Sequence, residues 1–168
     1  MMKKTTEIEP EEHKILAVVL KKKLDLAHRR TVVIKEYTSG KRLLDEEVAR
    51  GLYELFGIRN FIERNREPHE LENRFPLETN VVLLSEEEIE AGSWVAASGY
   101  WNWDKFRSQY DDSPLIELSR VSFDQDNKWA YLFFRLQANS EVGFGSYFLL
   151  ENRQGSWGIN SEFLVLNS

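Results

Sequence analysis

The feature that most constrains the fold of this chain is a series of four strand-like runs in its last third. They follow a turn at Asp111–Pro114, and short polar or glycine-containing segments separate them. The runs are Leu115–Phe123, Lys128–Ala138, Ser146–Asn152 and Trp157–Leu166. Connections this short join antiparallel neighbours, whereas parallel strands need a long crossover. The sequence therefore predicts a C-terminal antiparallel meander.

The second of these runs has bulky apolar side chains on both of its alternating faces. One face has Trp129, Tyr131 and Phe133, and the other has Leu132, Phe134 and Leu136. A strand that is apolar on both faces is covered on both. We therefore expect this strand to be central. If helices cover one face of the sheet, loops, a ligand or a second subunit must cover the other.

The residues before the meander show mostly helical patterns. We expect helices over Glu11–Arg30, Asp45–Phe56, Phe61–Arg66, the residues from the Ser85–Glu88 capping box to Gly92, and Trp103–Tyr110, with strands at Thr31–Tyr37 and Val81–Leu84. In the first helix the apolar stripe is Leu16, Val19, Leu20, Leu24 and Ala27. The predicted fold class is α+β, with N-terminal helices packed on a curved, mostly antiparallel sheet that ends in the C-terminal meander.

Length and composition indicate one globular domain over residues 1–168, and the order of residues 1–10 stays open. The chain is 42% hydrophobic and 30% charged, and it has no Cys. The absence of Cys excludes thiolate zinc sites, thiol catalysis and redox switching. No apolar stretch approaches the about 20 residues of a membrane span, and the N-terminal region is too acidic for a signal peptide. We therefore expect a cytoplasmic protein that does not enter a membrane.

The acidic charge is concentrated in the second half of the chain. The net charge is −6, and residues 85–168 account for −7 with 6 basic and 13 acidic residues. The same half contains 16 of the 21 aromatic residues. An acidic, lysine-poor surface repels a phosphate backbone, so nucleic acid is not an expected partner. A basic protein is.

The segment Gly145–Ile159 combines a hydrophobic strand, a turn at Gly155 and the sequence Trp157-Gly158-Ile159. In this pattern it resembles the closing hairpin of nuclear-transport-factor-two-like domains, the cystatin-like α+β cones. The resemblance implies a cone-shaped pocket, which that family uses as a small-ligand site, an enzyme site or a dimer surface. With Leu118–Phe123 and Val33–Gly40, the segment also looks like a set of uncharacterised bacterial proteins.

The sequence contains no catalytic, metal or cofactor motif. The three histidines, His13, His28 and His69, are scattered, and Glu9 with His13 supplies only two ligands. The Gly143-Phe144-Gly145 segment lacks the lysine and the following helix of a phosphate-binding loop. Ser98-Gly99 lacks the glycine that precedes a nucleophile elbow. We therefore expect no metal and no cofactor, and an enzyme is the less favoured class.

Charged residues within the meander have two interpretations. Arg120 and Arg135 lie beside apolar residues, so either could point into a pocket and bind a carboxylate or phosphate. Either could instead pair across the sheet with Glu117 or Glu151. The two carboxylates could act in acid–base chemistry if buried, or lie on the solvated outer face.

The aromatic segment Trp94–Tyr110 contains the strongest candidate residues. It is either core packing or an exposed platform for a protein partner. Our first hypothesis is a non-enzymatic interaction protein, an accessory or inhibitor-type binder that can form a homodimer. The alternative is a small-molecule-binding or enzymatic pocket domain. The candidate binding residues are Trp94, Tyr100, Trp101, Trp103, Arg120 and Tyr131.

Overall fold

The order of elements starts with the longest described helix and ends with the three longest described strands, which are antiparallel. The computed structural model describes residues 8–39, 57–58, 60–92, 94 and 101–167, so the predicted helix at Asp45–Phe56 lies outside the described residues. The elements are α1 (Pro10–Lys23), the 3-10 turn η1 (Leu26–His28), β1 (Thr31–Lys35), α3 (Phe61–Arg64), β2 (Asn80–Leu84), α4 (Glu86–Ala91), α5 (Trp103–Gln109), β3 (Leu115–Leu118), β4 (Ser122–Phe123), β5 (Trp129–Gln137), β6 (Gly143–Arg153) and β7 (Ser156–Asn167).

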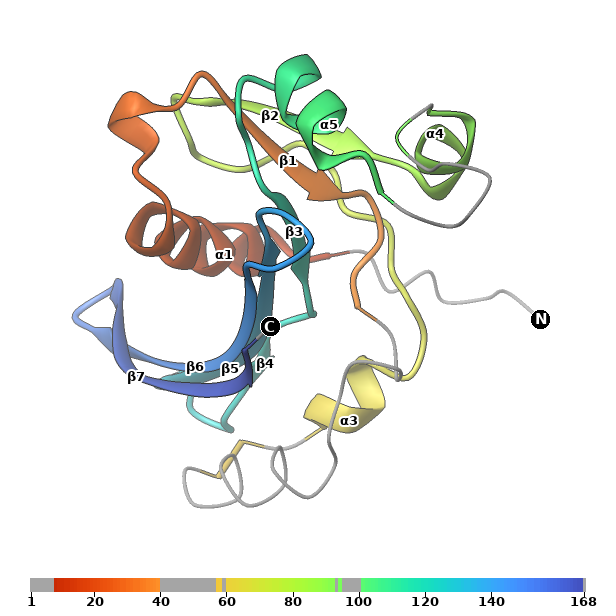
Figure 1. Cartoon of the computed structure of the whole chain (residues 1–168). Coiled ribbons are helices and arrows are strands. Elements are labelled where there is room, and N and C mark those ends of the chain that lie inside the picture. Colours follow the sequence, from red (N-terminus) through yellow and green to blue (C-terminus); the bar gives the residue numbers. More distant parts are fainter. Residues whose placement is uncertain (1–7, 40–56, 59, 93, 95–100, 168) are drawn as a thin grey trace.

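The strands form one seven-stranded sheet in the order β2-β1-β3-β5-β6-β7, and β4 pairs with β5. The pairs β3–β5, β5–β6 and β6–β7 are antiparallel, whereas β1 runs parallel to both β2 and β3. The sheet is curved, with α1 inside the curve and α3 on the other side (Figure 1). This confirms the predicted α+β class and the C-terminal meander.

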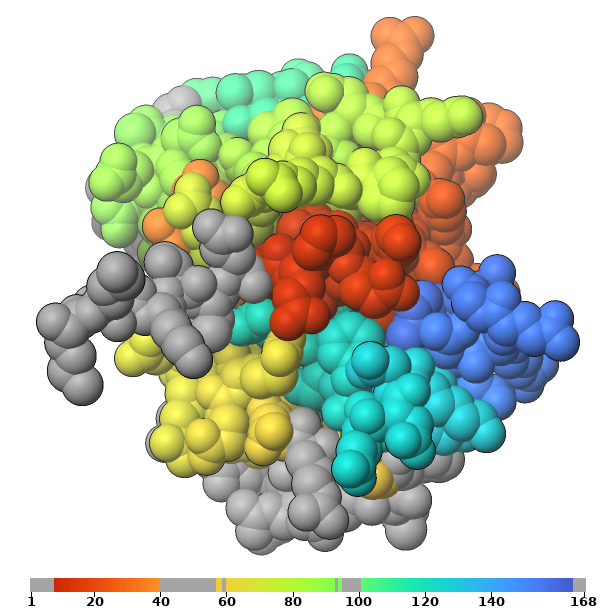
Figure 2. Space-filling view, turned by 180° about the vertical axis from the view of Figure 1, so that it is seen from behind, coloured from red at the N-terminus to blue at the C-terminus, as the bar shows by residue number. Residues whose placement is uncertain are grey.

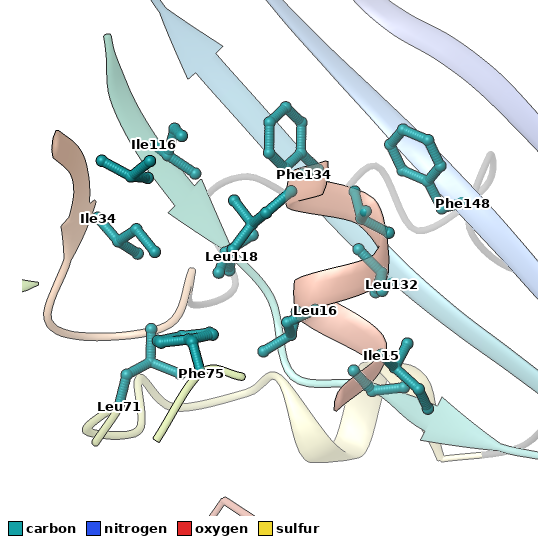
Figure 3. Packing of buried hydrophobic residues seen from close by; sticks show 14 of the residues in the cluster. Ile15, Leu16, Ile34, Leu71, Phe75, Ile116, Leu118, Leu132, Phe134 and Phe148 are labelled. Atoms are coloured by element: carbon teal, nitrogen blue, oxygen red, sulfur yellow. The ribbon is translucent and has the colours of Figure 1, made fainter. Parts of the chain in front are cut away.

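The main core lies between α1 and the concave face of the sheet. Leu16, Val19 and Leu20 of α1 are fully buried against residues of β3, β5 and β6. Figure 3 shows Leu16 and Ile15 beside Leu118 and Leu132, with Phe134 and Phe148 in the same layer. Viewed from behind, part of α1 reaches the surface between the β2 region and the β4 region (Figure 2). The concave face is therefore filled by the chain itself.

Two smaller clusters cover the opposite face of the sheet. One packs Phe61 of α3 and Ile58 against the aromatic side chains of β5 and β6. The other packs Trp94 and Phe106 against β1, β2 and β3. The strand β5 lies between β3 and β6, and residues on both of its faces are buried. The prediction of a central strand covered on both sides is confirmed.

Two predicted elements differ most from the observed ones. The first helix ends at Lys23, and Leu24 is extended and buried in the main core, so the chain turns back toward β1 instead of continuing to Arg30. The run Leu115–Phe123 is two strands, because Ser119–Val121 leaves the ladder. There the amides of Arg120 and Val121 bind the side chains of Asn65 and Glu12 instead of a neighbouring strand.

The β6–β7 hairpin closes with a two-residue turn. Gln154 and Gly155 have φ values of 55° and 86°, the pair of left-handed conformations typical of a type I′ turn. Trp157 at the start of β7 donates its indole N–H to Glu11 Oε1 at 2.6 Å. This bond fixes the hairpin to the first turn of α1.

We expect Leu16→Ala to lower the free energy of unfolding by about 2–5 kcal/mol, because it removes buried methyl groups and leaves a cavity in the main core. Val142→Ala is the matched control, since Val142 is 52% exposed and its change should affect stability little. Urea denaturation followed by circular dichroism measures both variants. Equal losses would contradict this description of the core.

Candidate functional site

A hollow of about 260 Å³ lies on the sheet face opposite α1. It is lined by Lys35, Trp101, Trp103, Leu115, Glu117, Arg135 and Gln137. Side chains alternate along a strand, so Leu115 and Glu117 face away from Ile116 and Leu118, which belong to the main core. The hollow therefore joins the ends of β1, β3 and β5 to the residues around the start of α5.

Two tryptophans form the aromatic wall of the hollow. The rings of Trp101 and Trp103 stack with their centroids 5.0 Å apart and an interplanar angle of 21°. Phe106, which is fully buried, contacts both rings edge-on. Asn102 begins α5 by accepting a hydrogen bond from the Lys105 amide at 3.1 Å, as the sequence predicts. The helix start thus holds the pair in place.

Trp94 supports this wall from inside the protein. It is 3% exposed and donates its indole N–H to Gln109 Oε1 at 3.0 Å. Its ring packs against Phe106 and Tyr110. Gly92 has to be glycine here, because a Cβ at this position would overlap the Trp94 ring. Trp94 is therefore a core residue that does not line the hollow.

The polar wall of the hollow comes from three neighbouring strands. Lys35 of β1 forms an ion pair with Glu117 of β3, whose side chain is only 15% exposed. Arg135 of β5 lies opposite Glu117 in the strand register. Gln137 donates its amide to the carbonyl of Asn139 at 2.6 Å. Two cations, one anion and one amide thus converge beside the tryptophans.

Arg120 lies elsewhere, in a buried ion pair with Glu12. Its Nη2 is 3.0 Å from Glu12 Oε2, and its Nε donates to Glu12 Oε1 at 3.3 Å. The two side chains are 4% and 0% exposed. Arg64 of α3 places Nη2 3.3 Å from the same carboxylate, and the Val121 amide donates to it at 3.1 Å. The carboxylate beside Arg120 is therefore Glu12, instead of the Glu117 or Glu151 considered from the sequence, and a role of Arg120 in binding stays a prediction.

Burial of Glu12 acts to raise its pKa, but its hydrogen bonds and nearby cations outweigh that effect. The hydrogen bond from Arg120, the hydrogen bond from the Glu9 amide and the charges of Arg120 and Arg64 bring the pKa of Glu12 below its ordinary value of 4.5. The carboxylate is therefore ionised at neutral pH. It neutralises one of the two guanidinium groups beside it.

The remaining candidate residues separate into different places. Tyr131 is fully buried and stacks on Tyr147, with ring centroids 5.2 Å apart and an interplanar angle of 11°. It belongs to the cluster under Phe61. Tyr100 lies outside the described residues. Of the five candidates that the structure describes, Trp101 and Trp103 line the hollow, and Trp94, Arg120 and Tyr131 lie elsewhere.

Sequence reasoning missed Glu12, Asn65 and Lys35 as structural or site residues. Glu12 has the same helical spacing as Leu16 and Leu20, so a carboxylate on the apolar stripe was a signal for a buried cationic partner. Asn65 and Lys35 had no comparable signal, because their roles depend on segments distant in the sequence. For Arg135 the sequence left a pocket role and a cross-strand pair open, and for Glu117 it left acid–base chemistry and a solvated outer face open.

No protein-family model, no curated protein and no solved structure matches this chain. Among the described residues, no helix is both long and apolar enough to cross a membrane. The same residues contain no group of three or more His, Asp or Glu side chains placed to hold a metal ion. The function is therefore argued from the geometry of the hollow.

We expect Glu12→Gln to lower the free energy of unfolding by about 3–5 kcal/mol near pH 7, because it leaves Arg120 and Arg64 without their counter-ion. Folding lowers the pKa of Glu12, so its stabilisation is complete above 4.5 and is lost as pH falls through the folded-state pKa. The difference between wild type and variant should therefore shrink below pH 4.5 in urea titrations at a series of pH values.

Glu63→Gln is the control for this experiment. The Glu63 side chain is 62% exposed and pairs with an exposed arginine, so its removal should have little effect at any pH. A wild-type to Glu12→Gln difference that stays constant from pH 7 to pH 3 would show that Glu12 is not stabilised as an anion.

Proposed function

We propose that this protein is a binding domain for a small planar molecule, which it holds in the hollow beside Trp101 and Trp103. The observation that supports this most is the meeting of a stacked indole pair with a few convergent polar groups over an apolar residue, Leu115. Ligand sites have this composition: an apolar or aromatic lining with a small number of polar groups that orient the ligand. The hollow is small, so the ligand is small as well.

Binding is favoured over catalysis by the chemistry of the lining. The only carboxylate among the described lining residues, Glu117, is ion-paired with Lys35. None of these lining residues is a His, Ser or Thr that could act as a nucleophile or base in the usual arrangements. The groups present can orient, stack and neutralise a ligand.

The exposed aromatic platform of the interaction hypothesis has less support. Trp94 is buried, and Trp101 and Trp103 are each only partly exposed. An interface hot spot made of tryptophan needs rings that a partner can cover. A hollow lined by the sides of two rings suits a small molecule better than a flat protein surface. A basic protein partner stays a prediction, which co-purification at low and high salt tests.

To test the binding proposal, we would add 2-naphthoate or 2-naphthamide to the full chain and record the indole N–H signals by ¹H–¹⁵N NMR. We expect the signals of Trp101 and Trp103 to shift in a saturable way with at least one probe, because an aromatic ring stacked on them changes their shielding. Trp101→Phe and Trp103→Phe spectra assign the two signals.

Trp157 provides the internal control, since it lies on β7 and does not line the hollow. Trp101→Ala with Trp103→Ala should abolish saturable binding, and Trp157→Phe should leave it unchanged. If neither probe shifts the Trp101 or Trp103 signal at millimolar concentration, the proposed function is wrong.

A second candidate, self-association, is favoured by the edge strand β7. It is 12 residues long, its only charged residue is Glu162, and Leu164 on it is 58% exposed. Within the described part of the chain no strand pairs with its outer edge. An unprotected edge of this kind can pair with another strand. A second copy of this chain is the occupant we propose, because a two-fold axis places β7 antiparallel to itself.

We expect light scattering of the wild type at about 100 µM to give a dimer mass if β7 pairs in this way. Leu164→Lys should shift the mass to that of a monomer, because a lysine on an edge strand opposes pairing. Val142→Lys is the matched control, since Val142 is 52% exposed but precedes β6. A monomeric wild type at this concentration would exclude the self-association candidate.

A further inference from the structure

The charges around the hollow do not balance. Lys35 and Arg135 supply two positive charges and Glu117 supplies one negative charge. The carboxylate of Glu117 is ion-paired with Lys35. Within the described part of the chain, no side-chain hydrogen bond or ion pair of Arg135 is found. Among the described lining residues, its guanidinium is therefore a cation without an ion-pair partner, although the whole chain has a net charge of −6.

Arg135 is partly exposed, and none of its nitrogen atoms is buried without a hydrogen-bond partner, so an anion in the hollow can reach its N–H groups. Arg135 lies on β5 directly opposite Glu117, at a distance across the sheet where opposite charges commonly pair. Lys35 occupies that carboxylate instead. The planar guanidinium is well suited to a carboxylate, because it can donate two parallel hydrogen bonds. Arg135 is thus the group in the hollow best placed to bind an anionic ligand.

The tryptophan pair indicates what chemical group the ligand has besides its anionic group. Trp101 and Trp103 both line the hollow, and their rings are nearly parallel. Phe106 packs edge-on against both rings, which limits their rotation. A rigid flat surface favours a flat partner, since offset-stacked rings gain contact area without losing much side-chain freedom. The ligand therefore combines a planar ring with an anionic group.

Size and charge favour a carboxylate over a phosphate. The volume of about 260 Å³ lies just below the usual range for ligand sites, about 300–1,000 Å³. One or two fused rings with a short acidic group fit this space. A phosphate monoester has a charge of about −1.5 to −2 at neutral pH. Among the described lining residues only Arg135 is a cation without an ion-pair partner, and the nearby Glu117 would repel a second negative charge.

We infer that the ligand is a singly charged aromatic carboxylate, whose ring packs against the Trp101–Trp103 pair and whose carboxylate binds Arg135. This inference rests on the proposed binding function and adds the chemical class of the ligand. It assigns specificity to Arg135, which neither the stacked rings nor the Lys35–Glu117 ion pair can provide.

Isothermal titration of the full chain with three matched probes tests this assignment. The probes are 2-naphthoate, 2-naphthamide and 2-naphthyl phosphate, which share one ring system and differ in charge. We expect 2-naphthoate to bind at least tenfold more tightly than 2-naphthamide and more tightly than the phosphate. In Arg135→Gln the acid and the amide should bind equally. Arg153→Gln is the control, because its side chain is 76% exposed at the far end of β6, and it should keep the preference.

The other possible outcomes show whether the binding function, the carboxylate assignment or both are wrong. If the amide binds at the tryptophan pair as tightly as the acid, the binding function stands and the carboxylate assignment is overturned. If the phosphate binds most tightly, the carboxylate assignment is again overturned. If no probe binds, both proposals fail. Should Arg135→Gln not fold, as judged by circular dichroism, the comparison of the three probes on the wild type decides the question.

Discussion

The ion pair of Glu12 with Arg120 is the interaction on which the arrangement of the main elements depends. One carboxylate, fully removed from solvent, joins the first turn of α1, the interruption between β3 and β4, and Arg64 of α3. A buried carboxylate is tolerated only when charge and hydrogen bonds compensate for its lost hydration, and here four separate groups donate to it or neutralise it. This cluster therefore fixes the position of α1 relative to the sheet, and the sheet curves around α1.

The position of α1 determines which face of the sheet can hold a ligand. The concave face is filled by side chains such as Leu16, Leu132 and Phe148, all fully buried. Entry of a ligand there would require displacement of the main core. The opposite face is covered in two patches, one under Phe61 and one around Trp94 and Phe106. The hollow lies at the edge of the second patch, where charged residues replace apolar ones on β3 and β5.

Sequence patterns predicted the elements whose signals lie within a few neighbouring residues. They did not predict features that depend on a residue far along the chain. The capping box at Ser85 and the Asn102 cap are local, and both helices begin as expected. The alternation of β5 is local too, and both of its faces are buried. The interruption after Leu118 was not predictable, because Asn65 and Glu12 satisfy the backbone there from far along the chain. The composition of the hollow also depends on contacts between distant segments. The sequence marks Trp101 and Trp103 as candidates, but their place beside Arg135 depends on strand pairing, which brings β3 next to β5.

The proposed binding at Arg135 would also link the ligand to the stability of the fold. Arg135 lines the hollow on β5, and Glu117, which lies opposite it, is ion-paired with Lys35. A ligand that binds only the folded chain stabilises it, and the gain grows with the logarithm of the ligand concentration above Kd. An aromatic carboxylate that binds as proposed would therefore stabilise the folded chain, because it would supply Arg135 with the counter-charge that Glu117 gives to Lys35.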